Sequence, residues 1–267
     1  SVKVLSELMA SALFEGEAGN PVTSPDLKAF DFKNAKNANL KTVGKIERTP
    51  TQNVVGMIEG SDPKLKSEFV SIGAHYDHEG VRPTAPGEDK IWNGADDDGS
   101  GTVAILAMAE SLAKSKVKPK RSILFLWYAG EEKGLLGSEY FTKFPTVPFD
   151  KITVNINIDM IGRSRKADNV DPRDKDLSGE NEIYVIGSNM MSTKLGEVTS
   201  TVNKTYLNMA YNLKYDDPKD TNRFFFRSDH FNFAVRGIPA VFFFNGVHQD
   251  YHQAGDHPDK IDYKRME

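Results

Sequence analysis

The sequence predicts an α/β domain in which a mixed, mostly parallel central sheet carries helices on both faces. From residue 53 onward, apolar runs of strand length alternate with runs that have apolar residues at helical spacing. Strands and helices that alternate in this way fold into sheets with helical crossovers. Acidic residues and histidines also follow several strand runs directly, which is typical of sites at the carboxyl edge of such a sheet.

The elements follow from the apolar spacing, taken in chain order. Residues 2–13 have helical spacing and precede a loop rich in Gly, Pro and Ser. The predicted strands are 53–59, 69–74, 122–128, 152–158, 183–186 and 240–244. The other predicted helices are 102–113, 135–144, 192–203 and 229–235. The polar segment 163–182 is predicted to be a long surface loop. The sequence does not decide whether its acidic residues bind a structural calcium ion.

Composition excludes several classes of protein. Hydrophobic residues make up 39% and charged residues 27% of 267 residues, which is ordinary for a folded globular chain. A net charge of -4 with no basic stripe argues against a nucleic-acid partner. The apolar runs are far shorter than the roughly 20 residues of a membrane helix, so we expect no membrane span. Without cysteine, any metal site must use His, Asp and Glu.

Two regions are expected along the chain. Residues 53–267 form the predicted catalytic domain. Residues 1–52 are predicted to be a helix and a connecting segment that belongs to the same domain or follows a missing domain. No apolar leader precedes Ser1, so a removed leader would not be visible.

Six candidate functional residues come directly after predicted strands or in the loop that follows one. The carboxyl ends of the strands in an open α/β sheet meet along one crevice, so we expect these side chains to converge. His and carboxylate side chains together are ligands for zinc, and a free carboxylate beside them can accept a proton from metal-bound water. The residues are His75, Asp77, Glu131, Glu132, Asp159 and His252.

Each motif also has a purely structural alternative. The three aspartates 96–98 precede a helix and can cap its N-terminus, although adjacent carboxylates repel one another unless a cation lies between them. Glu131 and Glu132 can be exposed acids at the start of a helix. The histidines outside the main set, His78, His248 and His257, are expected on surface loops.

A serine nucleophile is the weaker mechanistic alternative. Ser228, Asp229 and His230 are consecutive at the start of a predicted helix, where Ser228 or Asp229 is expected to cap it. The Gly-x-Ser-x-Gly motif of a nucleophile elbow is not present in the sequence.

Five blocks of sequence, in order, resemble the family-28 zinc metallopeptidases, which include bacterial secreted leucyl aminopeptidases and glutamate carboxypeptidase-like enzymes. They are SIGAHYDH, NGADDDGSG, YAGEEKGLLGSEYF, NINIDMIGR and RSDHFNFAVRGIPAVFFFNGVHQDYHQAGDHPDKID. The resemblance covers about residues 53–266.

The resemblance implies two zinc ions and a role for each candidate residue. It implies that Asp77 orients His75, that Glu131 is the general base, and that the peptide bond between Asp96 and Asp97 is cis. Its implied ligands are His75 and Asp159 for one zinc, Glu132 and His252 for the other, and Asp96 as the bridge between them.

The implied activity is that of an aminopeptidase that removes hydrophobic N-terminal residues from peptides, in the periplasm or outside the cell. A glutaminyl cyclase, a carboxypeptidase or dipeptidase of the same fold, and a non-catalytic binding domain remain alternatives. Some relatives place a tyrosine shortly before Ser-Asp-His to stabilise the oxyanion. Here residues 224–226 are phenylalanines, so the sequence does not identify the group with that role.

Overall fold

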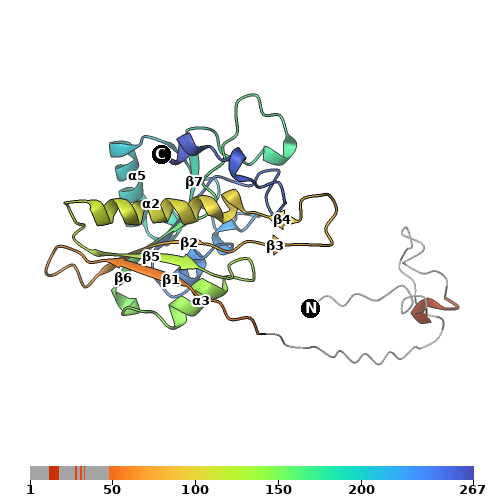
Figure 1. Cartoon of the computed structure of the whole chain (residues 1–267), viewed down its shortest axis with the longest axis horizontal. Coiled ribbons are helices and arrows are strands. Elements are labelled where there is room, and N and C mark those ends of the chain that lie inside the picture. The colour runs from red at the N-terminus through yellow and green to blue at the C-terminus, as the bar shows by residue number, and fades with distance from the viewer. Residues whose placement is uncertain (1–11, 18–27, 29–30, 32, 34–47) are drawn as a thin grey trace. The chain divides into compact units, whose positions relative to one another are not determined.

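The computed structural model describes residues 12–17, 28, 31, 33 and 48–267 (Figure 1). Contacts divide the chain into two units, Ser1–Thr49 and Pro50–Glu267. The helix predicted over residues 2–13 lies largely outside the described residues, of which 12–14 form a helical turn. The second unit contains the whole sheet and is described below.

A seven-stranded mixed sheet forms the centre of this unit, with strand order β1-β5-β2-β6-β9-β7-β8. Neighbours among β5, β2, β6 and β9 are parallel, whereas β1 and β7 run antiparallel to β5 and β9. The carboxyl ends of the four parallel strands therefore lie along one edge. The bounds are Val54–Ile58 (β1), Phe69–His75 (β2), Ser122–Tyr128 (β5), Ile152–Ile158 (β6), Glu182–Ile186 (β7), Ala210–Asn212 (β8) and Ala240–Phe244 (β9).

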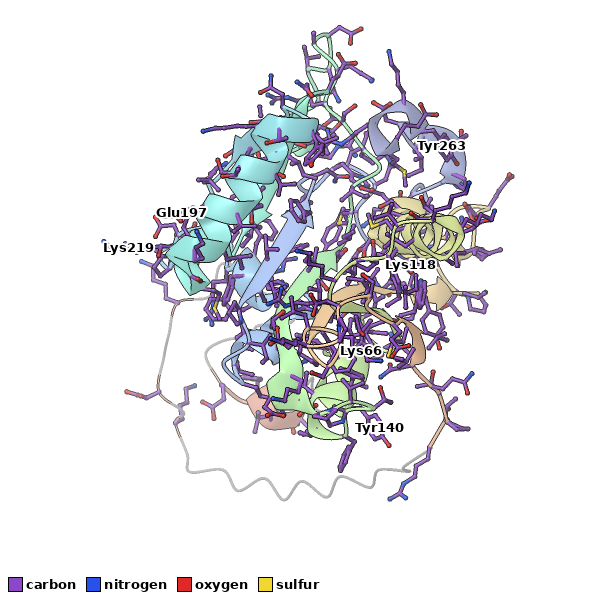
Figure 2. The ribbon with its side chains drawn as sticks, turned by 90° about the vertical axis from the view of Figure 1, so that its left-hand side faces the viewer. Lys66, Lys118, Tyr140, Glu197, Lys219 and Tyr263 are labelled. Carbon is purple, nitrogen blue, oxygen red and sulfur yellow. The ribbon has the colours of Figure 1, made fainter. Side chains whose placement is uncertain are left out.

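Helices cover both faces of the sheet. In Figure 1, α2 (Gly101–Lys114) and α5 (Thr193–Tyr206) lie above the strands and α3 (Leu136–Lys143) lies below them. The side view in Figure 2 again separates α5, which carries Glu197, from α3, which carries Tyr140. The short helix α6 (His230–Ala234) packs beside α3. The predicted α/β fold class is confirmed.

The side chains of β5 alternate between the two faces of the sheet, which explains why helices pack against both faces. Leu124 and Leu126 pack with Phe141 of α3 in one buried cluster. Between them along the strand, Phe125 packs with Ile105 of α2 in another. Successive strand side chains point to opposite faces, so an apolar strand requires an apolar partner on each side.

The structure adds short elements that the sequence pattern did not predict. A two-stranded hairpin, β3 (Gly80–Val81) and β4 (Ile91–Trp92), lies outside the main sheet. The remaining helices are α4 (Ser188–Met191) and α7 (Tyr263–Met266). Single turns of helix occur at Ala95–Ser100 (η1), Phe149–Lys151 (η2), Pro172–Asp174 (η3), Phe224–Phe226 (η4) and Pro258–Lys260 (η5).

The segment 163–182 is a loop that is tied to the domain by its own acids. Asp174 is buried, and its carboxylate accepts hydrogen bonds from the amide of Gln249 and the side chain of Asn169, both at 2.7 Å. These protein donors satisfy the carboxylate without a cation. Across the described residues, none of the helices is both long and apolar enough to cross a membrane.

Candidate metal centre and active site

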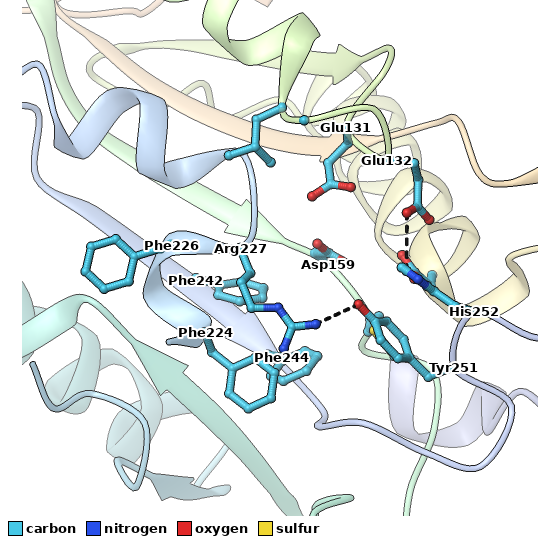
Figure 3. Close-up of a pocket in the computed structure, with 14 residues that line it drawn as sticks. Glu131, Glu132, Asp159, Phe224, Phe226, Arg227, Phe242, Phe244, Tyr251 and His252 are labelled. Carbon is cyan, nitrogen blue, oxygen red and sulfur yellow. Dashed lines mark hydrogen bonds and ion pairs between the residues drawn. The ribbon is translucent and has the colours of Figure 1, made fainter. Parts of the chain in front are cut away.

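Histidine and carboxylate side chains gather at the carboxyl edge of the four parallel strands. His75 is the last residue of β2, Asp159 follows β6, and Glu131 and Glu132 follow β5. The loop after β9 brings His252 to the same place, where its ring meets Glu132 (Figure 3). The convergence that the strand-end pattern predicts is therefore present in the structure.

The first group of candidate ligands consists of His75, Asp97 and Asp159, all of them buried. The Nε2 atom of His75 lies 3.2 Å from Asp97 Oδ1 and 3.7 Å from Asp159 Oδ1. Ser228 Oγ donates to the other oxygen of Asp159 at 2.6 Å, which fixes the direction of Oδ1. Ser228 thus positions a carboxylate, and the serine-nucleophile alternative loses its nucleophile.

The second group lies on the other side of Asp97. His252 Nε2 is 3.1 Å from Asp97 Oδ2 and 3.2 Å from Glu132 Oε2. His78 Nδ1 is 2.6 Å from Glu132 Oε1, and Glu79 completes a further ligand set with Glu132 and His252. Asp97 therefore faces both groups, one with each carboxylate oxygen.

The structure places Asp97, and not Asp96, between the two groups of candidate ligands, which differs from what the resemblance implies. Asp96 Oδ1 accepts from the amide of Gly162 at 2.7 Å and from Ser100 Oγ at 3.0 Å. Its Oδ2 lies 3.1 Å from His248 Nε2. Both oxygens are engaged away from the cluster, so the prediction of Asp96 as a ligand is corrected to Asp97.

Backbone contacts explain this shift by one residue. Asp256 Oδ2 accepts hydrogen bonds from the amides of both Asp96 and Asp97, at 2.9 and 3.1 Å, which fixes how the turn presents its side chains. Gly94 begins the turn with φ 62°, and a Cβ atom there would lie 2.3 Å from the carbonyl oxygen of Asp97. The cis peptide bond joins Asp97 to Asp98, not Asp96 to Asp97.

Asp77 has a different contact from the one predicted. The Nδ1 atom of His75 meets the backbone carbonyl of Asp77 at 2.9 Å, whereas the Asp77 carboxylate is 3.8 Å away. That carboxylate instead accepts from the amides of Glu131 at 3.1 Å and Glu132 at 3.4 Å. Asp77 therefore orients His75 through its main chain and the two glutamates through its side chain.

Glu131 lies beside the two ligand groups and belongs to neither of them. Its Oε2 is 3.9 Å from His75 Nε2. Burial first, and then the nearby carboxylates of Asp159, Asp229 and Asp97, raise the pKa of Glu131 to about 10 against the opposing effect of His75. A bound cation would oppose this effect and favour the ionised form.

The donor atoms fit a metal centre. Several buried side-chain atoms of the cluster have no hydrogen-bond partner among the described residues, a pattern that buried polar groups ordinarily avoid. Nitrogen and oxygen donors of this kind are ligands for zinc and similar divalent metals. These atoms are His75 Nε2, His78 Nδ1, Asp97 Oδ2, Glu132 Oε1 and Asp159 Oδ1.

Sequence reasoning missed three contributors to this centre. His78 was expected on the surface, yet its side chain is only 6% exposed and meets Glu132. Asp98 was expected to cap a helix; its Oδ1 does accept the Gly101 amide at 3.0 Å, and its Oδ2 also accepts the His75 amide at 3.1 Å. Glu79 directly follows His78, and the repeated acid and histidine pattern of residues 75–79 was the available signal. His248 is likewise buried, whereas His257 is half-buried, with 39% of its side chain exposed.

A cavity of about 290 Å³ opens beside the cluster. Asp97, Glu131, Glu132, Asp159 and His252 line its polar side. Its apolar lining consists of Leu135, Met160, Phe224, Phe226, Phe242 and Phe244, and Figure 3 shows the phenylalanines forming a wall on the side away from Glu132 and His252. Figure 3 shows Glu131 and Asp159 pointing toward the space that this wall bounds. The cavity can therefore hold an apolar group next to the metal ligands.

Tyr251 and Arg227 lie together at this cavity. The Nη2 atom of Arg227 donates to Tyr251 Oη at 3.0 Å, and the Arg227 guanidinium lies 4.9 Å from the centre of the Phe224 ring. Burial raises the pKa of Tyr251, which keeps its hydroxyl protonated. The sequence did not identify a tyrosine for this site, because Tyr251 follows Ser-Asp-His by about twenty residues.

An α/β domain with a histidine and carboxylate centre at the carboxyl edge of its sheet belongs to the class of metal-centred hydrolases. The chain belongs to peptidase family M28, whose model matches residues 53–267. The family predicted from the five sequence blocks is thereby confirmed.

Named relatives agree with this assignment. The chain is 29% identical over 211 residues to the "Probable leucine aminopeptidase 2" of Aspergillus fumigatus, covering 79% of this chain and 36% of that protein. The zinc aminopeptidase BSAP from Bacillus subtilis matches with a TM-score of 0.59 and 26% identity over 80% of this chain and 46% of that one. For the LapA aminopeptidase of Legionella pneumophila the TM-score is 0.57, with 25% identity over 80% and 50%. The chain thus spans about a third to a half of the length of these relatives.

Proposed function

We propose that this chain carries an aminopeptidase centre that binds two zinc ions and cleaves peptides after an apolar N-terminal residue. One observation carries the proposal: Asp97 presents one carboxylate oxygen to His75 and the other to His252, so a single residue joins two ligand groups. The names of the similar leucine and zinc aminopeptidases support both the metal and the reaction.

Each residue then has a task that its position allows. His75 and Asp159 would hold one ion, Glu132 and His252 the other, and Asp97 both. Bound zinc supplies a Lewis acid that polarises a peptide carbonyl and lowers the pKa of water. Glu131, which is bound to neither group, accepts the proton of the attacking water and delivers it to the leaving amine.

The cavity supports the choice of substrate. Its phenylalanine wall would receive the apolar side chain of the first residue, while the scissile carbonyl faces the ligands. Tyr251 is the only tyrosine that lines the cavity within the described residues, and its protonated hydroxyl can donate to the developing oxyanion.

Substrate and metal content test the proposal directly. The zinc-reconstituted protein should hold close to two zinc ions per chain by elemental analysis and hydrolyse leucine p-nitroanilide. The N-acetylated substrate should remain uncleaved, because an aminopeptidase requires a free amine. Cleavage of both substrates at equal rates would exclude an aminopeptidase, and one zinc ion with cyclisation of N-terminal glutamine would identify a glutaminyl cyclase instead.

The adjacent glutamates provide a matched pair of variants. Glu132→Gln should lose zinc and activity together, since a neutral amide is a poorer ligand than a carboxylate. Glu131→Gln should keep both ions and lose about 10²- to 10⁴-fold in kcat, the usual contribution of a general base. Zinc content and rate are measured on the same preparations. A fully active Glu131→Gln enzyme would refute the mechanism.

A further inference from the structure

Arg227 places a cation in the cavity beside the candidate metal centre. It immediately precedes Ser228, which holds Asp159, and its side chain is exposed to the cavity (Figure 3). Aromatic rings support the guanidinium, with the Phe224 ring centre at 4.9 Å and the Tyr251 ring centre at 6.0 Å. The position of the cation is therefore set by packing and not by an acidic partner.

The guanidinium has unused hydrogen-bonding capacity. Within the described part of the chain, its only side-chain hydrogen bond runs to Tyr251 Oη, and no carboxylate lies within ion-pairing distance. By contrast, Arg163 is paired with Asp250 and Asp256. A guanidinium has five N–H donors in a planar fork that matches the two oxygens of a carboxylate.

The carboxylates that line the cavity do not compensate this cation. Asp97, Glu131, Glu132 and Asp159 line the same cavity, yet within the described part of the chain none of them forms an ion pair with Arg227, whose side chain contacts Tyr251 and Phe224. Its positive charge is therefore open to an anion that enters the cavity.

We propose that Arg227 binds a carboxylate group of the substrate and makes the centre selective for acidic substrates; this rests on the proposed peptidase function. The carboxylate can be the C-terminus of a dipeptide, which leaves the apolar first residue of the proposed function in place, or an acidic side chain at the first residue, which would replace the apolar one. Both would form a charge-assisted, bidentate pair with the same guanidinium.

A purely structural role for Arg227 makes a different prediction. If the residue only holds the Tyr251 hydroxyl in place, its loss reduces the turnover of every substrate by the same factor. If it binds a substrate carboxylate, its loss removes the difference between a substrate with that carboxylate and its neutral amide. The ratio between matched substrates therefore separates the two roles.

Two pairs of substrates test the proposal with the zinc-loaded full chain. The first pair is Leu-Leu and Leu-Leu-amide, and the second is the p-nitroanilides of glutamate and glutamine. In at least one pair, wild-type kcat/KM should favour the acid by roughly tenfold or more, in line with a charge-assisted hydrogen bond. The pair that shows the preference identifies the source of the carboxylate.

Variants assign the preference to a residue. Arg227→Gln should abolish it mainly through KM, and Arg227→Lys should retain part of it, since the charge remains while the planar fork is lost. Arg223→Gln is the matched control, because Arg223 also stacks on a phenylalanine, Phe226, but does not line the cavity. Tyr251→Phe should reduce kcat/KM by the same factor for the acid substrate and for its matched amide.

The outcomes that overturn the proposal differ from those that overturn the function. A wild-type enzyme that cleaves acids and amides equally in both pairs contradicts the carboxylate site and leaves the peptidase assignment intact. An Arg227→Gln enzyme that still prefers the acid substrate also contradicts the carboxylate site and leaves the peptidase assignment intact. No turnover of any of the four substrates or of leucine p-nitroanilide contradicts the peptidase function itself.

Discussion

His230 is a fully buried histidine that takes no part in the proposed chemistry. Its ring stacks on Phe242 at 4.7 Å between centres and meets the edge of Phe225 at 5.3 Å. Neither ring nitrogen has a side-chain hydrogen-bond partner among the described residues, and only the main chain of Phe225 favours the protonated ring, against the larger effect of burial. Burial lowers the pKa of His230 to about 3, so the native protein holds it neutral.

This burial predicts a dependence of stability on pH. An unfolded histidine has a pKa of about 6.5, so between about pH 6.5 and pH 3 the unfolded chain binds a proton that the native state does not. The free energy of unfolding should therefore fall as the pH falls through this window. His230→Phe, which keeps the aromatic packing, should flatten this part of the profile in urea unfolding measured from pH 4 to pH 8.

His257→Phe is the control for that measurement, because the side chain of His257 is 39% exposed and pairs with Asp89 at 2.9 Å. Carboxylates titrate in the same acid range, so the difference between variant and wild type, and not the absolute slope, reports His230. If the slope is unchanged in His230→Phe, the prediction is wrong, because native His230 then binds a proton in this pH range as the unfolded chain does.

The three adjacent aspartates 96–98 show how much of the candidate site can be predicted from individual residues. The sequence indicates that a cation lies near residues 96–98, because three consecutive carboxylates repel one another. Which carboxylate faces the cation depends on the turn, and Asp256, far along the chain, holds the two amides that fix it. Long-range hydrogen bonds of this kind leave no local pattern, so Asp97 and Asp96 could not be distinguished from sequence alone.

The β3–β4 hairpin supports the second ligand group from outside the sheet. Trp92 of β4 donates its indole N–H to the carbonyl of His252 at 3.0 Å, and Arg82 stacks on the Trp92 ring at 4.8 Å. His252 has φ 53°, a left-handed conformation that is uncommon for a residue other than glycine. The hairpin therefore helps to hold a candidate ligand in a conformation that it would seldom adopt unaided.

Trp92→Phe tests this support, since it removes the N–H donor and keeps an aromatic ring. Loss of a hydrogen bond that orients a metal ligand typically costs about 10- to 100-fold in metal affinity. We expect the weaker binding for one zinc ion only, measured by competition with a chelator. Ile91→Val, an exposed change in the same strand, is the control. Equal weakening of both ions would contradict a role specific to His252.

The long elements were predictable and the short ones were not. All six predicted strands are present, and the ends of α2, α3, α5 and α6 lie within one to three residues of those predicted. Each has enough residues for its apolar period to appear. The strands β3, β4 and β8 have only two or three residues, and their pairing depends on distant segments.

At the scale of the whole molecule, the topology of the sheet explains why the site could be located from sequence. Parallel neighbours β5, β2, β6 and β9 all end at the same edge, so residues that follow different strands meet there. The phenylalanine wall, Tyr251 and Arg227 were not predicted as parts of one cavity. They come from loops and a single helical turn, whose positions the strand pattern does not determine.

The contact between Asp256 and the turn at Asp96–Asp97 has a consequence for biosynthesis. The ribosome adds the residues of the turn long before it adds Asp256, yet the carboxylate of Asp256 accepts hydrogen bonds from the two amides that orient Asp97. His252 also emerges late, so the sheet can begin to form on the nascent chain while the metal centre cannot. The chain therefore acquires its full set of candidate ligands only after the segment that carries His252 and Asp256 has been synthesised and has packed against the strands already made.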